Sequence, residues 1–262
     1  MTNFLKTLNQ GIFFKPARIG MVLVVLLGVS LREDKSRAQE EDTLSFFHTE
    51  GRDIVSDTTG ENFVFRGFNL NGLEFGTLFN RDPSSLSGYP GIEGTDYFKP
   101  RLEEPNDLAD IKSLGFNVVR VPFEWARLIP GWQPGDPFPP LESAYLGILN
   151  DIIEAAGRTG IYVILDMHDF LKYWSGLSSQ VCVNDDVDYQ ALLRHTWTLL
   201  AEHFHENPAV LGYDIMNEPE RGVPGACSSC NWHTIAQSVV NAIRSVDTNH
   251  LIFVEGPNFS LA

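Results

Sequence analysis

Apolar residues follow two different spacings along this chain, and the two spacings alternate. The segment 63–69 is mostly apolar, with a polar end, and is typical of a buried strand. Leu108, Ile111 and Leu114 then recur at helical spacing, and Gly115 ends the predicted helix. The same change of spacing repeats further on. It predicts strands over 116–122, 161–166, 210–216 and 250–255, and helices over 144–159, 189–204 and 232–246.

Strands that alternate with helices of this length indicate βαβ units and a parallel sheet. The chain contains neither a GxGxxG segment after its first strand nor a GxxxxGK[ST] segment, so the phosphate-binding loops of nucleotide folds are missing. The remaining candidates for the fold are a (β/α) barrel and a doubly wound sheet that binds something other than a nucleotide. Short strands with turns at Glu50-Gly51 and Thr59-Gly60 precede the first unit, and the Gly/Pro-rich segment 73–102 is long enough to be a functional loop.

The first 38 residues have the pattern of an export signal. Basic residues precede an apolar run of 13 residues, 19–31, which is shorter than the roughly 20 residues of a membrane span. Small residues at 36 and 38 have the spacing that signal peptidase prefers. We therefore expect a signal peptide over 1–38 and a secreted domain over 39–262. The charged stretch 32–35 keeps an uncleaved membrane anchor through 19–31 as the alternative.

The charge balance narrows the choice of partners. The chain has 34 acidic residues against 19 basic ones, a formal charge of −15. Without residues 1–38 it has 32 acidic and 13 basic residues. A nucleic-acid-binding protein needs a basic face, so this class is disfavoured, whereas an acidic exported protein suits a neutral substrate such as carbohydrate. We expect a monomer with no stable membrane association after signal cleavage.

The three cysteines allow more than one interpretation. Cys227 and Cys230 form a CxxC segment in a Gly/Pro/Ser-rich loop, which could be a redox motif or half of a zinc site. No second CxxC segment completes such a zinc site. A disulfide that staples the loop is the favoured interpretation, and both the involvement of Cys182 and the pairing are left open.

Polar residues follow each predicted strand of the parallel sheet. In a (β/α) barrel, reactive groups project from the carboxyl ends of the strands, so polar residues gathered there indicate a functional site. The residues in question are Arg66 and Asn69, Arg120, Asp166 to Asp169, Asn217 and Glu218, and Glu255.

Five segments carry a family resemblance, in the order in which the family has them. They are 67–72 (GFNLNG), 115–122 (GFNVVRVP), 164–168 (ILDMH), 212–219 (GYDIMNEP) and 250–256 (HLIFVEG). On these segments, residues 44–262 resemble the cellulase-like glycoside hydrolases of family 5, in the larger clan of retaining (β/α)8 glycosidases. The resemblance implies an α/β chain of (β/α)8 barrel type that hydrolyses a β-linked polysaccharide.

The resemblance also implies roles for individual residues. Glu218 matches the general acid/base, and Asn217 matches the residue that binds the sugar 2-hydroxyl. Arg120 matches the arginine near the nucleophile, and His168 matches a histidine of the substrate subsite. The chemistry agrees, since a glycosidic oxygen needs a proton donor to leave, and burial can raise the pKa of a glutamate enough to supply one.

The family's nucleophile has no match in this chain. It follows the seventh strand of the barrel, whereas only about five strands are predicted here. Glu255 follows the fifth strand, so the resemblance makes it an auxiliary carboxylate rather than the nucleophile. We therefore expect a C-terminally truncated catalytic domain over 39–262 with little or no activity of its own.

Aromatic residues near the second and third strands suggest a substrate that is a chain. Trp125, Trp132, Phe170, Tyr173 and Trp174 could each stack on a sugar ring or could pack into the core. We expect an open cleft with Trp174 among the substrate-binding residues. β-1,4-Glucan is the first expectation, while β-mannan, β-1,3-glucan and glycolipid specificities share the same strand motifs.

Two other functions stay open, and both concern the same strand ends. A barrel that lacks its nucleophile could bind carbohydrate without cleaving it. Asp166 and His168 lie on one side of a strand and could hold a metal, as in a metal-dependent hydrolase. Because the resemblance assigns His168 to substrate, we expect no required metal or cofactor.

Overall fold

The structure, a computed structural model, describes residues 44–74, 100–103, 106–174, 180–219 and 231–257, with Trp174 and Gln180 described by their backbone alone. The chain divides into two compact units, residues 1–40 and 41–262, and all described residues belong to the second unit. The predicted signal peptide lies outside the described residues. Within them, no helix is long and apolar enough to cross a membrane.

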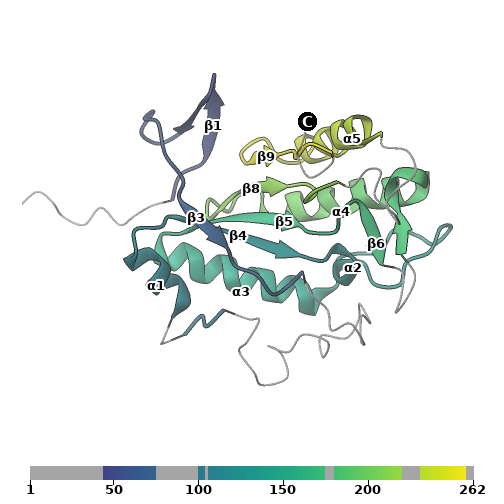
Figure 1. Ribbon diagram of the computed structural model, residues 1–262, viewed down its shortest axis with the longest axis horizontal. Helices are drawn as coiled ribbons and strands as arrows, with labels where there is room; N and C mark the ends of the chain where they lie inside the picture. Colours follow the sequence, from purple (N-terminus) through teal and green to yellow (C-terminus); the bar gives the residue numbers. More distant parts are fainter. Residues whose placement is uncertain (1–43, 75–99, 104–105, 175–179, 220–230, 258–262) are drawn as a thin grey trace, which may run out of the picture. The chain divides into compact units, whose positions relative to one another are not determined.

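The second unit is built on a five-stranded parallel sheet (Figure 1). The strands lie side by side in their order along the chain, so each connection steps to the next position in the same direction. The strands are β3 (Gly67–Asn69), β4 (Val118–Phe123), β5 (Tyr162–Met167), β8 (Val210–Asp214) and β9 (Leu251–Phe253).

Four helices pack on one face of this sheet. Their buried side chains share one hydrophobic core with the outward-facing strand residues, such as Val119, Val163 and Tyr213. A doubly wound sheet would carry helices on both faces, so the one-sided packing and the sequential strand order give the winding of a (β/α) barrel. The helices are α1 (Asp107–Ser113), α3 (Ser143–Thr159), α4 (Val187–Phe204) and α5 (Trp232–Arg244).

The predicted helix boundaries are within about two residues of the observed ones because local capping sets them. The carboxylate of Glu142 accepts the backbone N–H groups of Ala144 and Tyr145 at the start of α3. At its end Gly160 has φ 67°, a left-handed conformation that glycine adopts without steric cost. Gly115, at φ 86°, follows α1 in the same way, as predicted.

The other face of the sheet begins with an apolar layer at the amino ends of its strands. Val118, Tyr162, Leu211 and Leu251 form this layer with Phe47. Phe47 comes from a hairpin, β1 (Phe47–Glu50) and β2 (Asp53–Ser56), whose turn at Gly51 was predicted. The hairpin therefore supplies a hydrophobic cover for this end of the sheet.

The strand predicted over 63–69 is shorter than expected. Only Gly67–Asn69 pairs with β4, as strand β3. Phe63 and Phe65 instead place their rings 5.2 and 4.9 Å from the ring of Phe47, in the apolar layer. These residues are apolar because they cover the end of the sheet, not because they pair within it.

A bulge in β8 determines which of its side chains face inward. Val163 pairs with Val210 and Ile164 pairs with Gly212, so Leu211 is an extra residue. A Cβ atom on Gly212 would lie 2.3 Å from the carbonyl oxygen of Leu251, so only glycine fits there. Past the bulge, Tyr213 faces the helices and Asp214 faces inward.

Several short elements in the loops were not predicted. A helical turn, α2 (Trp125–Leu128), follows β4. A hairpin of β6 (Lys172–Trp174) and β7 (Gln180–Cys182) follows β5, and a 3-10 turn, η2 (Val183–Asp185), comes next. Cys182 is disulfide-bonded, which the sequence left open, while Cys227 and Cys230 lie outside the described residues.

Candidate active site

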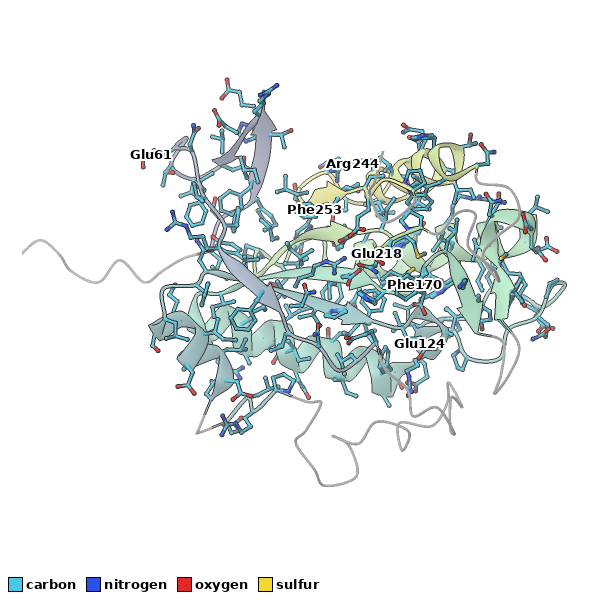
Figure 2. All side chains as sticks on the ribbon, viewed as in Figure 1. Glu61, Glu124, Phe170, Glu218, Arg244 and Phe253 are labelled. Atoms are coloured by element: carbon cyan, nitrogen blue, oxygen red, sulfur yellow. The ribbon has the colours of Figure 1, made fainter. Side chains whose placement is uncertain are left out.

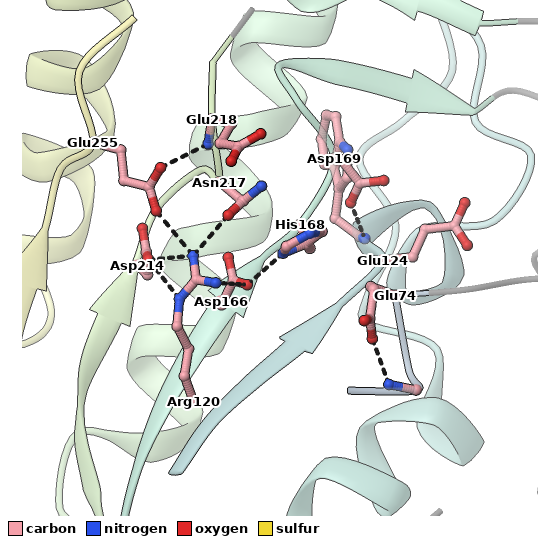
Figure 3. A network of polar contacts seen from close by, with 12 residues as sticks. Glu74, Arg120, Glu124, Asp166, His168, Asp169, Asp214, Asn217, Glu218 and Glu255 are labelled. Atoms are coloured by element: carbon pink, nitrogen blue, oxygen red, sulfur yellow. Dashed lines mark hydrogen bonds and ion pairs between the residues drawn. The ribbon is translucent and has the colours of Figure 1, made fainter. Parts of the chain in front are cut away.

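A single arginine connects four polar side chains at the carboxyl ends of the strands (Figure 3). Arg120, from the middle of β4, reaches residues of β5, β8 and the segments after β8 and β9. Its Nη2 lies 2.7 Å from Asp214 Oδ2 and 3.0 Å from both Asn217 Oδ1 and Glu255 Oε1, and its Nη1 lies 2.8 Å from Asp166 Oδ2. We call these five residues the Arg120 centre.

The Arg120 centre holds more negative than positive charge. Burial by itself would lower the pKa of Arg120, but Asp166, Asp214 and Glu255 outweigh it and raise that pKa. Burial, with the charge of Asp166 beside it, raises the pKa of Asp214 to about 7 against the opposing effect of Arg120. Burial also raises the pKa of Asp166. One arginine therefore does not fully compensate three carboxylates at neutral pH.

Two buried oxygen atoms in the Arg120 centre have no hydrogen-bond partner among the residues that the structure describes. They are Oδ1 of Asp166 and Oδ1 of Asp214, from residues that pair across β5 and β8. Buried polar atoms are nearly always hydrogen-bonded in folded proteins, so unsatisfied ones mark a place where stability has been given up. Such places are common at functional sites.

His168 joins the centre through Asp166. Its Nδ1 lies 2.7 Å from Asp166 Oδ2, and since an ionised carboxylate only accepts, Nδ1 donates and Nε2 is the acceptor. In the described part of the chain, Nε2 has no hydrogen-bond partner of its own. It can therefore accept a hydrogen bond from a sugar hydroxyl.

Glu218 lies next to the centre and is tied to it by its backbone. Its N–H donates to Glu255 Oε2 at 2.9 Å, and its φ is 42°, a left-handed conformation that costs about 1 to 3 kcal/mol for a residue other than glycine. Its carboxylate points away from Glu255 (Figure 3) and makes no hydrogen bond or ion pair to other described residues. A carboxyl group that is held by its main chain and left open at its oxygens can donate a proton to a ligand.

Three of the five aromatic residues singled out from the sequence pack into the core. Trp125 and Tyr173 are fully buried, with their rings 4.9 Å apart, and the indole N–H of Trp125 donates to the carbonyl of Lys172 at 2.7 Å. Trp132 is also buried, beside Tyr189. These three rings pack the loops that follow β4 and β5 onto the helices, so the core-packing alternative holds for them.

Phe170 and Trp174 are the two aromatic residues that stay candidates for sugar contacts. Phe170, in the loop after β5, is half-buried, and its ring lies 5.4 Å from the ring of His168. Figure 2 labels it together with Glu218, which lies in the loop after β8. The side chain of Trp174 lies outside the described residues, so its predicted role stays a prediction.

Two acidic residues of the site were not singled out from the sequence. Asp214 was missed because the bulge at Leu211 reverses the inward and outward positions, which strand alternation alone cannot reveal. Glu74 follows β3; its carboxylate accepts the N–H of Gly72 at 2.6 Å, and burial raises its pKa. Its charge interacts with His168, so it belongs to the same end of the sheet.

Residues 166 and 168 do not offer the metal site that the sequence left open. Asp166 Oδ2 already contacts both Arg120 and His168, and a guanidinium so close opposes a cation. Within the described ranges, no group of three or more His, Cys, Asp and Glu side chains could hold a metal ion.

A parallel sheet wound in one direction, with an arginine and several carboxylates at its carboxyl ends, defines a site of the (β/α)-barrel class. The model of the cellulase family, glycosyl hydrolase family 5, matches residues 59–262, and the chain belongs to this family.

Three relatives show how far the similarity extends. The endoglucanase of Paenibacillus polymyxa is 28% identical over 218 residues, which cover 80% of this chain and 50% of that protein. Endo-beta-1,4-glucanase A of Emericella nidulans is 28% identical over 216 residues, covering 79% and 54%. The solved structure of the Pseudomonas stutzeri endoglucanase Cel5A in complex with cellobiose is 31% identical, with a TM-score of 0.52, and covers 72% of this chain and 50% of that one. The chain thus spans about half the length of the curated relatives it matches.

Proposed function

We propose that the protein hydrolyses a β-linked polysaccharide, with β-1,4-glucan as the expected substrate, by a retaining mechanism in which Glu218 is the general acid/base. The observation that carries this proposal is Glu218, whose backbone is anchored to Glu255 and whose carboxylate makes no hydrogen bond or ion pair to other described residues. Two relatives are named endoglucanase and endo-beta-1,4-glucanase A, and these names support a β-glucan as the substrate class.

The neighbouring residues would bind and orient the sugar. Asn217 is buried, and its Oδ1 is occupied by Arg120, which leaves its NH2 group to donate to a sugar 2-hydroxyl. His168 would accept from a hydroxyl through Nε2. Arg120 would hold the surrounding carboxylates in place through its hydrogen bonds and ion pairs, and Trp174 is expected to add a stacking surface.

The reaction would begin with proton transfer. Glu218 donates a proton to the glycosidic oxygen as the bond to the anomeric carbon breaks, and its carboxylate later takes a proton from water. In a retaining enzyme a second carboxylate, roughly 5 to 5.5 Å from the first, must attack the anomeric carbon from the opposite face of the sugar. Glu255 does not suit this role, because both of its oxygens already accept hydrogen bonds, one from Arg120 and one from the Glu218 amide.

We therefore propose that this chain binds cello-oligosaccharides but hydrolyses them slowly. The test measures cellopentaose binding by calorimetry and hydrolysis of carboxymethyl-cellulose and an aryl β-cellobioside, for the wild type and for Glu218→Gln. We expect binding by both proteins, and slow product release that falls by about 10²-fold or more in the variant.

Each deviation from this result has one meaning. Absence of cellopentaose binding contradicts the proposed function. Hydrolysis that Glu218→Gln leaves unchanged contradicts the role of Glu218. Fast hydrolysis that the variant abolishes contradicts only the proposal of slow turnover.

The alternatives concern specificity and catalysis at the same site. A carbohydrate-binding barrel without catalysis would bind cellohexaose and release no product at any enzyme concentration. A β-mannanase would bind mannopentaose more tightly than cellopentaose, so the ratio of the two affinities decides between the two substrates.

We also propose export through a signal peptide over residues 1–38. The support is the basic start, the short apolar run and the small residues at 36 and 38. Expression of the full chain in a secreting host, followed by N-terminal sequencing, should yield a protein that begins at Gln39. A membrane-bound product that retains residues 19–31 would favour the anchor instead.

A further inference from the structure

We propose that Glu255 is a positioning residue whose carboxylate holds the backbone of Glu218 in the conformation that presents the acid/base side chain to the substrate. The inference rests on the proposed role of Glu218. It assigns to Glu255 a function that is neither that of a nucleophile nor that of a sugar ligand.

The backbone of Glu218 needs an outside contact to stay as it is. Its φ of 42° lies in the left-handed region, which residues with a Cβ atom rarely occupy. Pro219 follows it, and the residue before a proline normally prefers an extended conformation. Left to local preferences, this segment would straighten and carry the Glu218 side chain elsewhere.

Glu255 supplies the contact that opposes this straightening. Its Oε2 accepts the Glu218 N–H at 2.9 Å, and an ionised acceptor makes this bond stronger than one between neutral groups. The two residues come from neighbouring strand ends, after β8 and after β9, so the bond ties two loops together (Figure 3). The contact is to the main chain of Glu218 and leaves its carboxylate open.

The Glu255 carboxylate is itself fixed in place from two sides. Its Oε1 accepts from Arg120 Nη2 at 3.0 Å. Its backbone carbonyl accepts the indole N–H of Trp232, a fully buried residue at the start of α5, at 2.7 Å. A carboxylate anchored at its main chain and at one oxygen can act as a rigid support for what its second oxygen binds.

One substitution separates the two bonds that Glu255 makes. A glutamine offers one oxygen acceptor, whereas Arg120 and the Glu218 amide are both donors. The oxygen should stay with the charged arginine, which leaves the NH2 group facing the Glu218 N–H. Glu255→Gln therefore removes the bond to Glu218 while it keeps the size of the side chain.

The first readout follows the Glu218 amide and needs no turnover. In protein labelled with ¹⁵N-glutamate, the Glu218 signal is the one that disappears in Glu218→Gln. We expect its hydrogen exchange to become roughly 10-fold faster in Glu255→Gln. Glu154→Gln is the matched control, since that carboxylate is mostly exposed on α3, and it should leave the exchange unchanged.

The second readout tests the effect on proton donation. A phenyl leaving group needs a proton from the acid, whereas a dinitrophenyl group leaves readily without one. We expect kcat/KM for phenyl β-cellobioside, which covers only the steps up to release of the phenol, to fall about 10-fold or more in Glu255→Gln, with kcat/KM for the dinitrophenyl substrate nearly unchanged.

The results against the proposal are distinct from those against the proposed function. An unchanged Glu218 exchange rate, or equal losses on both substrates, overturns the positioning role. Absence of turnover in the wild type bears on the proposed function alone, and the exchange rate still decides the inference. If Glu255→Gln does not fold, Trp232→Phe replaces it. This variant keeps the Glu255 carboxylate but removes the hydrogen bond to its backbone carbonyl, so exchange of the Glu218 amide must become faster.

Discussion

Two clusters in this protein each hold a buried aspartate, and its pKa is shifted in opposite directions in the two. In the Arg120 centre, burial raises the pKa of Asp214 to about 7. In the second cluster, burial is outweighed by hydrogen bonds from His250 and Tyr213, which lower the pKa of Asp247 to about 2. The difference lies in how completely each carboxylate is hydrogen-bonded.

The second cluster is satisfied atom by atom. Asp247 Oδ2 lies 2.6 Å from both the Tyr213 hydroxyl and Nδ1 of His250, and its Oδ1 accepts the backbone N–H of Asn249 at 2.8 Å. Nε2 of His250 faces the carbonyl of Asn207 at 3.0 Å. The Arg120 centre, by contrast, contains two buried oxygens that have no hydrogen-bond partner in the described ranges of the chain. We interpret the first arrangement as built for stability and the second as kept for a ligand.

The largest expected effect comes from breaking the satisfied cluster. Asp247→Ala removes the acceptor and leaves His250 and Tyr213 buried without it, which should cost about 3 to 5 kcal/mol of unfolding free energy. Urea denaturation measures this loss. Asp151→Ala, at an exposed position of α3, is the control and should change little. If Asp247→Ala lost no more unfolding free energy than the control, the cluster would not have the stabilising role proposed for it.

The two clusters should change the stability of the protein with pH in opposite directions. Between the ordinary pKa of an aspartate and about 7, the folded state holds a proton on Asp214 that the unfolded state has lost, so stability falls as the pH rises. Between about 2 and the ordinary value, only the unfolded state holds a proton on Asp247, so stability falls as the pH decreases. Unfolding free energies from pH 2.5 to 8 should therefore pass through a maximum near pH 4 to 5.

The variant Asp214→Asn tests whether the buried charge of Asp214 in the Arg120 centre destabilises the protein. The variant should be more stable than the wild type by roughly 2 kcal/mol at pH 8 and nearly equal to it at pH 4, because it removes a buried charge that Arg120 only partly compensates. Paired urea titrations at the two pH values measure this. A variant that is less stable at pH 8 would mean that the ionised form of Asp214 contributes to folding.

The smallest effect is expected from a single hydroxyl group. Tyr213→Phe removes the donor to Asp247 and leaves His250 as the remaining side-chain partner, which should cost about 1 kcal/mol. The pH range in which the variant loses stability on the acid side should also shift, since Asp247 would lose part of what lowers its pKa. A thermal melt at pH 7 and one at pH 3 measure both changes. Identical melts for the variant and the wild type would exclude Tyr213 from the cluster's stability.

The sequence predicted the parts of this fold that depend on local pattern. Helices α3 and α4 follow from apolar spacing and capping, and the strand-end residues Arg120, His168 and Asn217 follow from the family motifs. The bulge at Leu211, which turns Asp214 inward, depends on pairing with a neighbouring strand, and the glycine at position 212 is a local sign of it that strand alternation alone does not use. Trp125 and Tyr173 look the same in sequence whether they face a sugar or a core, and only the packing of the loops decides.

The central proposal is that the Arg120 centre binds a β-glucan. It is tested most directly by measuring how a substitution of Asn217 changes the affinity for cellopentaose. Asn217→Ala removes the amide predicted to meet the sugar, while Asn241→Ala changes an exposed amide on α5 as the control. We predict at least about 10-fold weaker cellopentaose binding for Asn217→Ala and no change for the control, with both proteins folded. Equal affinity of Asn217→Ala and the wild type for cellopentaose would contradict the account.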